Sequence, residues 1–183
     1  KDKITNNTNI RGRVADENRI GEIKAGFKDV EVDNYVDITE RLQSDGSFTL
    51  DKTALEIIYG DTLPDGNLTL NLISQDEFGN QSDIYDFEFT LDTTIEEPTL
   101  DLIPESDSGV SSSDNITLTK NPTISGTGEA FSRVELLDGD NQSLGETTVG
   151  SDGSWEITTP EFADGEYEIY SSATDIAGNQ ISS

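Results

Sequence analysis

Two stretches of this sequence, LPDGNLTLNLISQDEFGNQS at residues 63–82 and FADGEYEIYSSATDIAGNQI at residues 162–181, align without a gap at a constant offset of 99. The identical positions are Asp65, Gly66, Asp76, Gly79, Asn80 and Gln81, which meet Asp164, Gly165, Asp175, Gly178, Asn179 and Gln180. Upstream matches are DGSF at 45–48 with DGSW at 152–155, and IRG at 10–12 with ISG at 124–126. Because these landmarks follow the same order twice, the chain contains an internal duplication, which indicates an array of similar modules.

Apolar residues alternate with polar ones in many short runs, which is the pattern of half-buried β-strands. The alternating apolar positions are Val36, Ile38 and Leu42; Leu68, Leu70 and Leu72; Tyr85, Phe87, Phe89 and Leu91; Val134 and Leu136; and Tyr167, Ile169 and Ser171. Asp-Gly and Gly-Asn pairs between the runs supply the positive-φ residues that tight hairpins need. In the second copy we expect strands near 99–103, 122–127, 132–137, 143–149, 154–158, 166–174 and from 180 onward.

Short strands with turn signals every 8 to 12 residues predict β-sandwiches, and each copy is close to the roughly 100 residues of an immunoglobulin-like domain. We therefore predict an all-β chain of two tandem immunoglobulin-like β-sandwich domains arranged end to end, at residues 1–93 and 94–183. The first copy carries an insertion near 53–61, expected to form a short helical turn or an extended loop. The second copy stops before the counterpart of residues 84–92, so we expect its last strand to be truncated.

Composition argues against several classes of function. The chain has 38 acidic and 11 basic residues, a formal net charge of −27, no cysteine and no histidine. Nucleic acids and anionic lipid surfaces would repel it, and no apolar stretch reaches the 18 residues of a membrane helix. The commonest nucleophilic and acid–base arrangements cannot be built without Cys or His, and a carboxylate pair for glycoside hydrolysis has no specificity among 38 acids. We expect no enzyme, no nucleic-acid partner and no membrane insertion.

The same charge raises the question of a bound cation. Self-repulsion destabilises a compact state unless counter-ions bind, and ligand sets made only of oxygen suit hard cations, above all Ca²⁺. The alternative interpretation is a solubilising acidic surface, as in proteins from salty habitats.

The second copy resembles a known family. The resemblance rests on the following residues: DTT at 92–94, Pro98, SDSGVSSSDNIT at 106–117, ISGTGEA at 124–130, DGSWEIT at 152–158, ADGEY at 163–167 and TDIAGNQIS at 174–182. Together they resemble the bacterial Ig-like extender repeats of giant type I-secreted, biofilm-associated, RTX-type adhesins. The first copy shares DGSF, PDGN and DEFGN, and its residues 12–22 resemble variant extender repeats. The resemblance implies an extracellular stalk on the bacterial cell surface, rigidified by calcium at the domain junctions.

The duplicated D-x-x-G-N turn suggests where such an ion would bind. If the strands alternate in direction, this turn lies at the end of each domain where the chain enters it. In the second domain Asp175, the Glu129 loop and the Asp152 turn would then meet Asp92 at the end of the first domain. Crowded carboxylates raise one another's pKa or recruit a metal, and calcium accepts 6 to 8 oxygens with loose geometry. We predict an inter-domain calcium bound by Asp92, Glu129 and Asp175.

Two further sets are candidates. The equivalent set of the first domain, whose preceding partner is missing and which should bind weakly, consists of Asp16, Asp45 and Asp76. The loop at 106–115 could enclose an ion locally between Asp107, Asp114 and its backbone carbonyls. For Asp76 and Asp175 the alternative is a turn role, in which the carboxylate bonds its own backbone.

The resulting functional hypothesis is a non-catalytic, calcium-rigidified spacer of a large secreted bacterial surface adhesin that serves cell adhesion and biofilm formation. We expect a monomer whose partners are neighbouring repeats of the same chain, with the adhesion ligand outside this segment. One alternative is a carbohydrate-binding or accessory module of a secreted polysaccharide-acting enzyme, which predicts an exposed aromatic face. Another is an S-layer or cell-wall structural domain, which differs mainly in its flanks.

Overall fold

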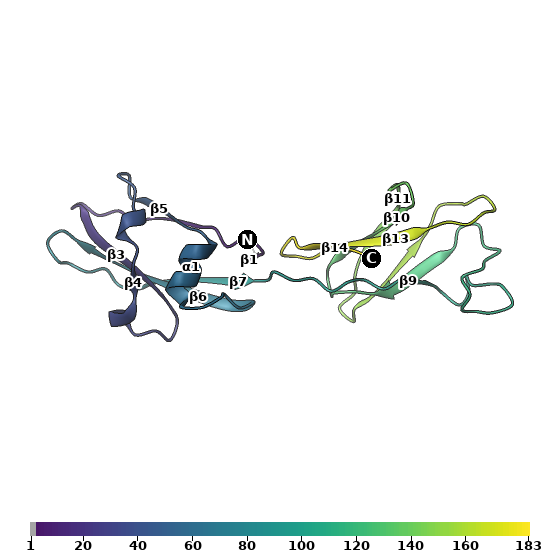
Figure 1. Ribbon diagram of the computed structural model, residues 1–183, viewed down its shortest axis with the longest axis horizontal. Helices are drawn as coiled ribbons and strands as arrows, with labels where there is room; N and C mark the ends of the chain where they lie inside the picture. The colour runs from purple at the N-terminus through teal and green to yellow at the C-terminus, as the bar shows by residue number, and fades with distance from the viewer. Residues whose placement is uncertain (1–2) are drawn as a thin grey trace. The chain divides into compact units, whose positions relative to one another are not determined.

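The protein is described here by a computed structural model, which covers residues 3–183 and divides them after Thr93 into two compact units (Figure 1). Both units consist of β-sheets, with a single α-helix in the first. The prediction of an all-β sandwich fold is therefore confirmed. Within residues 3–183, no helix is both long enough and apolar enough to cross a bilayer.

The first unit contains a five-stranded sheet and a two-stranded sheet. The large sheet has the order β1 (Ile4–Thr5), β7 (Tyr85–Leu91), β6 (Gly66–Asp76), β3 (Ile20–Phe27) and β4 (Val36–Asp37). The small sheet pairs β2 (Ile10–Arg13) with β5 (Ser47–Leu50). The remaining elements are the 3₁₀ helices η1 (Val32–Asn34) and η2 (Thr39–Arg41) and the helix α1 (Lys52–Tyr59). All pairings are antiparallel except that of β1 with β7.

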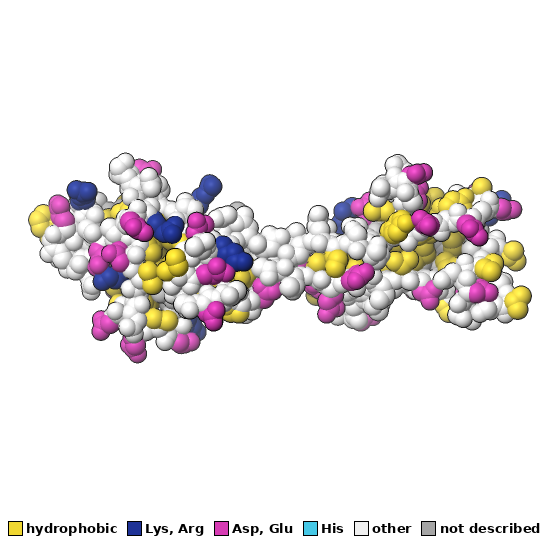
Figure 2. Space-filling view, viewed as in Figure 1, with side chains coloured by type: hydrophobic (Ala, Val, Ile, Leu, Met, Phe, Trp, Pro, Cys, Tyr) yellow, Lys and Arg dark blue, Asp and Glu magenta, His cyan; other side chains and the backbone are white. Residues whose placement is uncertain are grey.

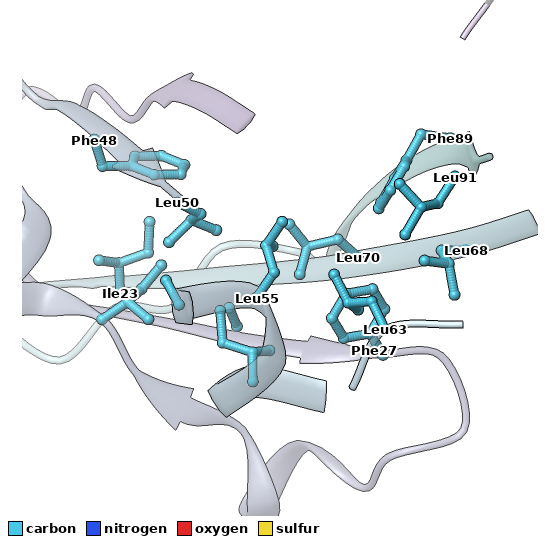
Figure 3. Close-up of a cluster of buried hydrophobic side chains, with 14 residues drawn as sticks. Ile23, Phe27, Phe48, Leu50, Leu55, Leu63, Leu68, Leu70, Phe89 and Leu91 are labelled. Carbon is cyan, nitrogen blue, oxygen red and sulfur yellow. The ribbon is translucent and has the colours of Figure 1, made fainter. Parts of the chain in front are cut away.

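The core of the first unit lies between these sheets and α1 (Figure 3). Leu70 of β6 and Leu50 of β5 are fully buried, and they come from different sheets. On β7 every second side chain faces the core, and Phe89 and Leu91 have only 6% and 2% of their surface exposed. Burial of such side chains contributes about 1.5–3 kcal/mol each, so β7 is an energetically important part of this unit.

The second unit contains a four-stranded and a three-stranded sheet. The four-stranded sheet has the order β11 (Ser143–Thr148), β10 (Arg133–Asp138), β13 (Ile169–Thr174) and β14 (Gln180–Ser182). The three-stranded sheet has the order β12 (Ser154–Thr158), β9 (Thr123–Thr127) and β8 (Asp101–Leu102). The seven strands predicted from the sequence are all present, and the core joins Trp155 and Ile124 of one sheet to Val134 and Leu136 of the other.

The landmarks shared by the two copies have a common structural reason. Gly12 of β2 lies opposite Phe48 of β5, and Gly126 of β9 lies opposite Trp155 of β12. An added Cβ at Gly12 would overlap the Phe48 ring, and one at Gly126 would meet both the Trp155 ring and the carbonyl oxygen of Thr99. Glycine is therefore required here because an aromatic side chain of the neighbouring strand lies across it.

The insertion of the first copy forms α1, the helical one of the two predicted alternatives. Asp51 caps its N-terminus, where a side-chain oxygen accepts from the Ala54 backbone N–H at 2.9 Å, and Gly60 ends it in the left-handed conformation. These are the usual start and stop signals of a helix. Leu55 and Ile58 are buried, so the insertion contributes to the core.

The predicted strand through Val36, Ile38 and Leu42 is wrong beyond its first two residues, because η2 replaces it after β4. The Asp37 carboxylate accepts from the Thr39 backbone N–H at 2.8 Å, and such a local bond competes with strand pairing. Ile38 is nevertheless buried, with 2% of its surface exposed.

The strand expected at 166–174 begins only at Ile169, and Tyr167, expected on the core side, is 47% exposed. Pairing with β10 starts at Ile169. Residues 165–168 therefore have no neighbouring strand within the described part of the chain.

Candidate metal centre

The D-x-x-G-N turn of the second unit holds Asp175 in a fixed orientation. Its Oδ1 accepts from the backbone N–H groups of Gly178 and Asn179 at 2.6 and 2.8 Å, and its Oδ2 accepts from Asn179 Nδ2 at 2.7 Å. Gly178 takes a φ of +96°, which favours glycine. The turn role considered for Asp175 is therefore present. It leaves Oδ2 with capacity to bind a cation, because a carboxylate oxygen has more than one acceptor site.

The same turn touches the first residue of the second unit. Asn179 Nδ2 donates to the Thr94 carbonyl oxygen at 3.2 Å. The D-x-x-G-N turn thus lies at the end of the unit where the chain enters, as the alternation of strand direction predicted. In the sequence Asn179 is only a landmark of the repeat, and nothing there distinguishes it from other turn asparagines.

A second carboxylate lies close to Asp175. One carboxylate oxygen of Glu129 is within 4.8 Å of one of Asp175, although 46 residues separate the two in the sequence. Glu129 follows β9, and the loop is fixed by the Gly128 N–H, which donates to the Gly153 carbonyl oxygen at 3.0 Å. Two carboxylates this close repel each other in water and are stabilised by a shared cation or proton.

Asp152, whose turn is expected near the inter-domain site, and Asp45 of the first-domain candidate set both form turns through their carboxylates. Asp152 Oδ1 accepts from both the backbone N–H and the hydroxyl of Ser154, and Asp45 Oδ1 makes the same pair of bonds with Ser47. The serine hydroxyl and N–H bonds to the charged form hold the pKa of each carboxyl below its usual value.

The third predicted ligand, Asp92, belongs to the first unit. It follows β7 directly, and its backbone N–H donates to the Thr5 carbonyl oxygen at 3.1 Å. This bond continues the parallel pairing of β1 and β7, so Asp92 is anchored by the backbone of its own unit.

The equivalent set of the first unit is not gathered in the same way. Asp76 Oδ1 accepts from the N–H groups of Phe78 and Asn80, while its Oδ2 accepts from the side chains of Asn80 and Asn18. The Asn80 side chain is the main reason why the pKa of Asp76 lies below its usual value. Asn18 links Asp76 to Asp16, since its backbone N–H donates to Asp16 Oδ1 at 2.8 Å.

These bonds already satisfy Asp76, and no group of three carboxylates of ion-binding size occurs within the described part of the first unit. Asp16 and Asp45 instead line a hollow of about 740 Å³ together with Arg13 and Arg19. Guanidinium groups supply positive charge there, which competes with a metal. Among the described residues, the structure does not gather Asp16, Asp45 and Asp76 into one group of ion-binding size, and the weak half-site predicted there stays a prediction.

The loop candidate contains one buried carboxylate and one exposed one. Asp107 is only 4% exposed, and its Oδ2 accepts from the backbone N–H groups of Asp114 and Asn115 at 3.1 and 3.3 Å. Its Oδ1 is buried without a hydrogen-bond partner among the described residues. Asp114 Oδ1 accepts from the Ile116 N–H and lies beside Gly109. Burying a charged oxygen without a partner is costly, so this atom is suited to contact a cation.

The fold and the repeated turn define a class of protein, an all-β chain of immunoglobulin-like sandwich units. Residues 94–183 match the family model of the bacterial Ig-like domain, and this half of the chain belongs to that family. No relative of the chain is found among curated proteins.

Solved structures similar to the chain include three of bacterial origin or name. A "Biofilm associated protein - BSP domain" is 17% identical at a TM-score of 0.35, with 98% of this chain and 28% of that chain covered. Fibronectin(III)-like modules of Clostridium thermocellum CbhA are 14% identical at a TM-score of 0.44, with 98% of this chain and 84% of that chain covered. A structure of a 1.5-MDa bacterial ice-binding adhesin is 14% identical at a TM-score of 0.40, with 98% of this chain and 58% of that chain covered. The chain thus spans under a third of the first of these structures.

Proposed function

We propose that this chain is a non-catalytic spacer of a large secreted bacterial surface adhesin, with Ig-like units that calcium stiffens outside the cell. The observation that carries the proposal is the Glu129–Asp175 carboxylate pair beside the turn that holds Thr94. The bacterial Ig-like family of residues 94–183 supports the module class. The acidic side chains spread over the visible surface of both units (Figure 2) fit an environment rich in cations.

The covalent chain supplies the third ligand in this proposal. Asp92 precedes Thr94 by two residues, and two trans peptide units span at most about 7 Å between Cα atoms. Since Asn179 binds the Thr94 carbonyl oxygen, Asp92 is proposed as the third ligand of an ion bound by Asp175 and Glu129. Such an ion would tie the last strand of one unit to the first loop residues of the next and so limit bending.

A second ion is proposed beneath the loop at Asp107. Asp107 Oδ1, the Asp114 side chain and carbonyl oxygens of the loop are the candidate ligands. Sites of this type in extracellular modules bind calcium with dissociation constants of roughly 10⁻⁴ to 10⁻³ M, so millimolar external calcium fills them and cytosolic calcium does not.

The test compares melting and small-angle scattering in millimolar calcium and in EDTA. We expect calcium to raise Tm by several degrees, since an ion that binds only the folded form stabilises it, and to narrow the range of interunit distances. Asp175→Asn should abolish the part of the Tm shift due to the Glu129–Asp175 site.

Asp76→Asn is the matched control. It changes the same turn in the first unit and removes the same charge, but Asp76 has no third carboxylate near it in the described structure. The calcium response should survive Asp76→Asn. An identical maximum dimension and Tm with and without chelator would contradict the proposal.

A further inference from the structure

Basic side chains are unevenly distributed over this acidic chain. Of its 11 lysines and arginines, only Lys120 and Arg133 belong to the second unit, and all others precede residue 53. Figure 2 accordingly shows the dark blue side chains mainly on the first unit. Positive charge that gathers locally raises the concentration of anions near it, so the first unit is the part of the chain suited to an anionic ligand.

Two arginines of the first unit have no acidic partner. Elsewhere in this unit Arg41 lies 3.8 Å from a carboxylate oxygen of Asp51. Within residues 3–183, by contrast, neither Arg13 nor Arg19 forms an ion pair. Arg13 uses only its Nε in the fold, which donates to the Asp45 carbonyl oxygen at 3.1 Å. Both arginines line the hollow of about 740 Å³, so two guanidinium groups are available to one ligand there.

The backbone of the surrounding loops fixes the shape of this hollow. The Val14 N–H donates to the Gly46 carbonyl oxygen at 2.9 Å, and Gly46 takes a φ of +82°. On the other side the Glu77 N–H donates to the Arg19 carbonyl oxygen at 2.9 Å. Val14 and Leu42 line the hollow and also pack against the first core, so part of its floor is apolar. Preformed hollows of about 300–1,000 Å³ are typical of sites for small molecules.

The hollow also presents hydrogen-bond acceptors. Asp16 Oδ1 accepts from the Asn18 backbone N–H, and Asp45 Oδ1 accepts from Ser47. Within the described residues, the Oδ2 atom of each of these carboxylates accepts no hydrogen bond, and both residues line the hollow with Glu77. A ligand that carries negative charge and no donors would be repelled by these carboxylates while the arginines attract it.

A sugar acid satisfies both kinds of group. Its carboxylate accepts charge-assisted hydrogen bonds from guanidinium groups, whose planar fork matches carboxylate geometry, and its hydroxyls donate to carboxylate oxygens. The side chains of an acidic peptide supply the first interaction and not the second. At physiological ionic strength the Debye length is about 8 Å, so acidic groups farther away are largely screened while those in the hollow act on the ligand.

We propose that the hollow binds a uronate residue of an acidic polysaccharide, with the sugar carboxylate at Arg13 and Arg19 and sugar hydroxyls at Asp16 and Asp45. The first unit then has a ligand of its own in addition to its role as a spacer. The site needs no calcium, because the arginines supply the positive charge. It is therefore independent of the ion proposed at Asp175.

The experiment titrates a trimer of galacturonic acid into the whole chain in EDTA, followed by NMR of the backbone amides. We expect saturable shifts at residues 13–21 and 42–46, which form the two loops around the hollow. Two further probes separate the interactions, since the methyl-esterified trimer keeps the hydroxyls without the charge and triglutamate keeps the carboxylates without the hydroxyls. Both should bind at least about tenfold more weakly than the trimer.

Arg19→Gln is the most direct variant, because the Arg19 side chain makes no ion pair within the described residues and its loss should leave the fold intact. It should weaken binding of the trimer about tenfold, since hydrogen bonds from a charged donor are lost. Arg11→Gln is the matched control: it removes the same charge from β2, and Arg11 does not line the hollow. Its affinity for the trimer should equal that of the original chain.

Equal affinity for the ester would show that the carboxylate is not recognised, and equal affinity for triglutamate would show that charge alone is recognised. Either result overturns the proposal, as does the absence of saturable shifts around the hollow. Binding that appears only when calcium replaces EDTA also overturns it, because an ion and not Arg19 would then hold the carboxylate. That result would leave the calcium-stiffened spacer standing, and failure of the spacer's own test would leave this site standing.

Discussion

Trp155 and Gly126 face each other across β12 and β9, and a Cβ placed on Gly126 would lie 2.8 Å from Cζ2 of the indole. It would also collide with the Thr99 carbonyl oxygen, which belongs to the backbone and cannot rotate away. Gly126→Ala should therefore destabilise the second unit by about 1–3 kcal/mol, the usual cost of overpacking. Urea unfolding followed by Trp155 fluorescence measures this.

Gly128→Ala is the control for that substitution. A Cβ at Gly128 would make ordinary contacts, 3.6 Å from Val149 Cγ2 and 3.7 Å from Pro98 Cβ. We expect its free energy of unfolding to change by less than about 0.5 kcal/mol. Equal losses in the two variants would show that close approach at Gly126 is not what requires glycine.

The inserted helix α1 offers a second prediction, because neighbouring residues on it differ sharply in burial. Leu55 is fully buried and Ile57 is 58% exposed. Leu55→Ala should cost the first unit about 2–5 kcal/mol by removing core contacts and leaving a cavity, while Ile57→Ala should cost no more than about 0.5 kcal/mol. Calorimetry of the two variants distinguishes them. If both are neutral, the insertion is an appendage and not part of the core.

The sequence was informative where local signals and tertiary structure agree. Strands of the second unit were predictable where polar and apolar residues alternate and where a turn signal follows, as at β10, which ends at Asp138-Gly139, and at β13, which ends at the turn with Gly178-Asn179. β3, which pairs with both β4 and β6, was not predicted: its IGEIKAGF sequence contains two glycines and a lysine, and a lysine and glycines are poor strand formers on their own. The start of β13 was misplaced because strand formation at residues 165–168 depends on a neighbour and not on local propensity.

Glu129 and Asp175 were predicted from the sequence as ligands of one site, and the fold brings their carboxylates close together. Asp16 and Asp76 were equally good candidates in the sequence, because the repeat gives the turns at Asp76 and Asp175 the same residues. The two sites differ because the Asn18 side chain donates a hydrogen bond to Asp76 Oδ2, and because Arg13 and Arg19 line the same hollow as Asp16. The Asn18–Asp76 contact joins residues 58 positions apart in the sequence, which the repeat pattern does not reveal.

The contribution of the turn carboxylate Asp152 to the free energy of unfolding should depend on pH. The pKa of Asp152 is lowered from 3.8, chiefly because the Ser154 hydroxyl and N–H bond the charged form. A group with a depressed folded pKa stabilises the fold above its unfolded pKa, and this contribution is lost as pH falls through the folded value. Asp152→Asn should therefore be less stable than the original at pH 7, and the gap should close below pH 3.8. A gap independent of pH would mean that charge at Asp152 is irrelevant. Trp155-monitored urea curves at several pH values decide this.

The buried Asp107 gives the sharpest prediction, because the sign of its effect should reverse with calcium. In EDTA the carboxylate keeps an unpartnered buried oxygen, at a cost of about 1–3 kcal/mol, so the neutral Asp107→Asn variant should be at least as stable as the original. In calcium at about 100 times the dissociation constant, the original should gain about 2.7 kcal/mol by linkage and the variant should not. Urea curves followed by Trp155 in both buffers measure the reversal.

Asp138→Asn is the matched control, since Asp138 is a turn carboxylate of the same unit that accepts from the N–H groups of Asp140 and Gln142. It removes one negative charge without touching the loop at Asp107, and its calcium response should equal that of the original chain. If calcium stabilises Asp107→Asn as much as it stabilises Asp138→Asn, then the unpartnered oxygen of Asp107 binds no ion. The acidic loop would then owe its charge to solubility alone.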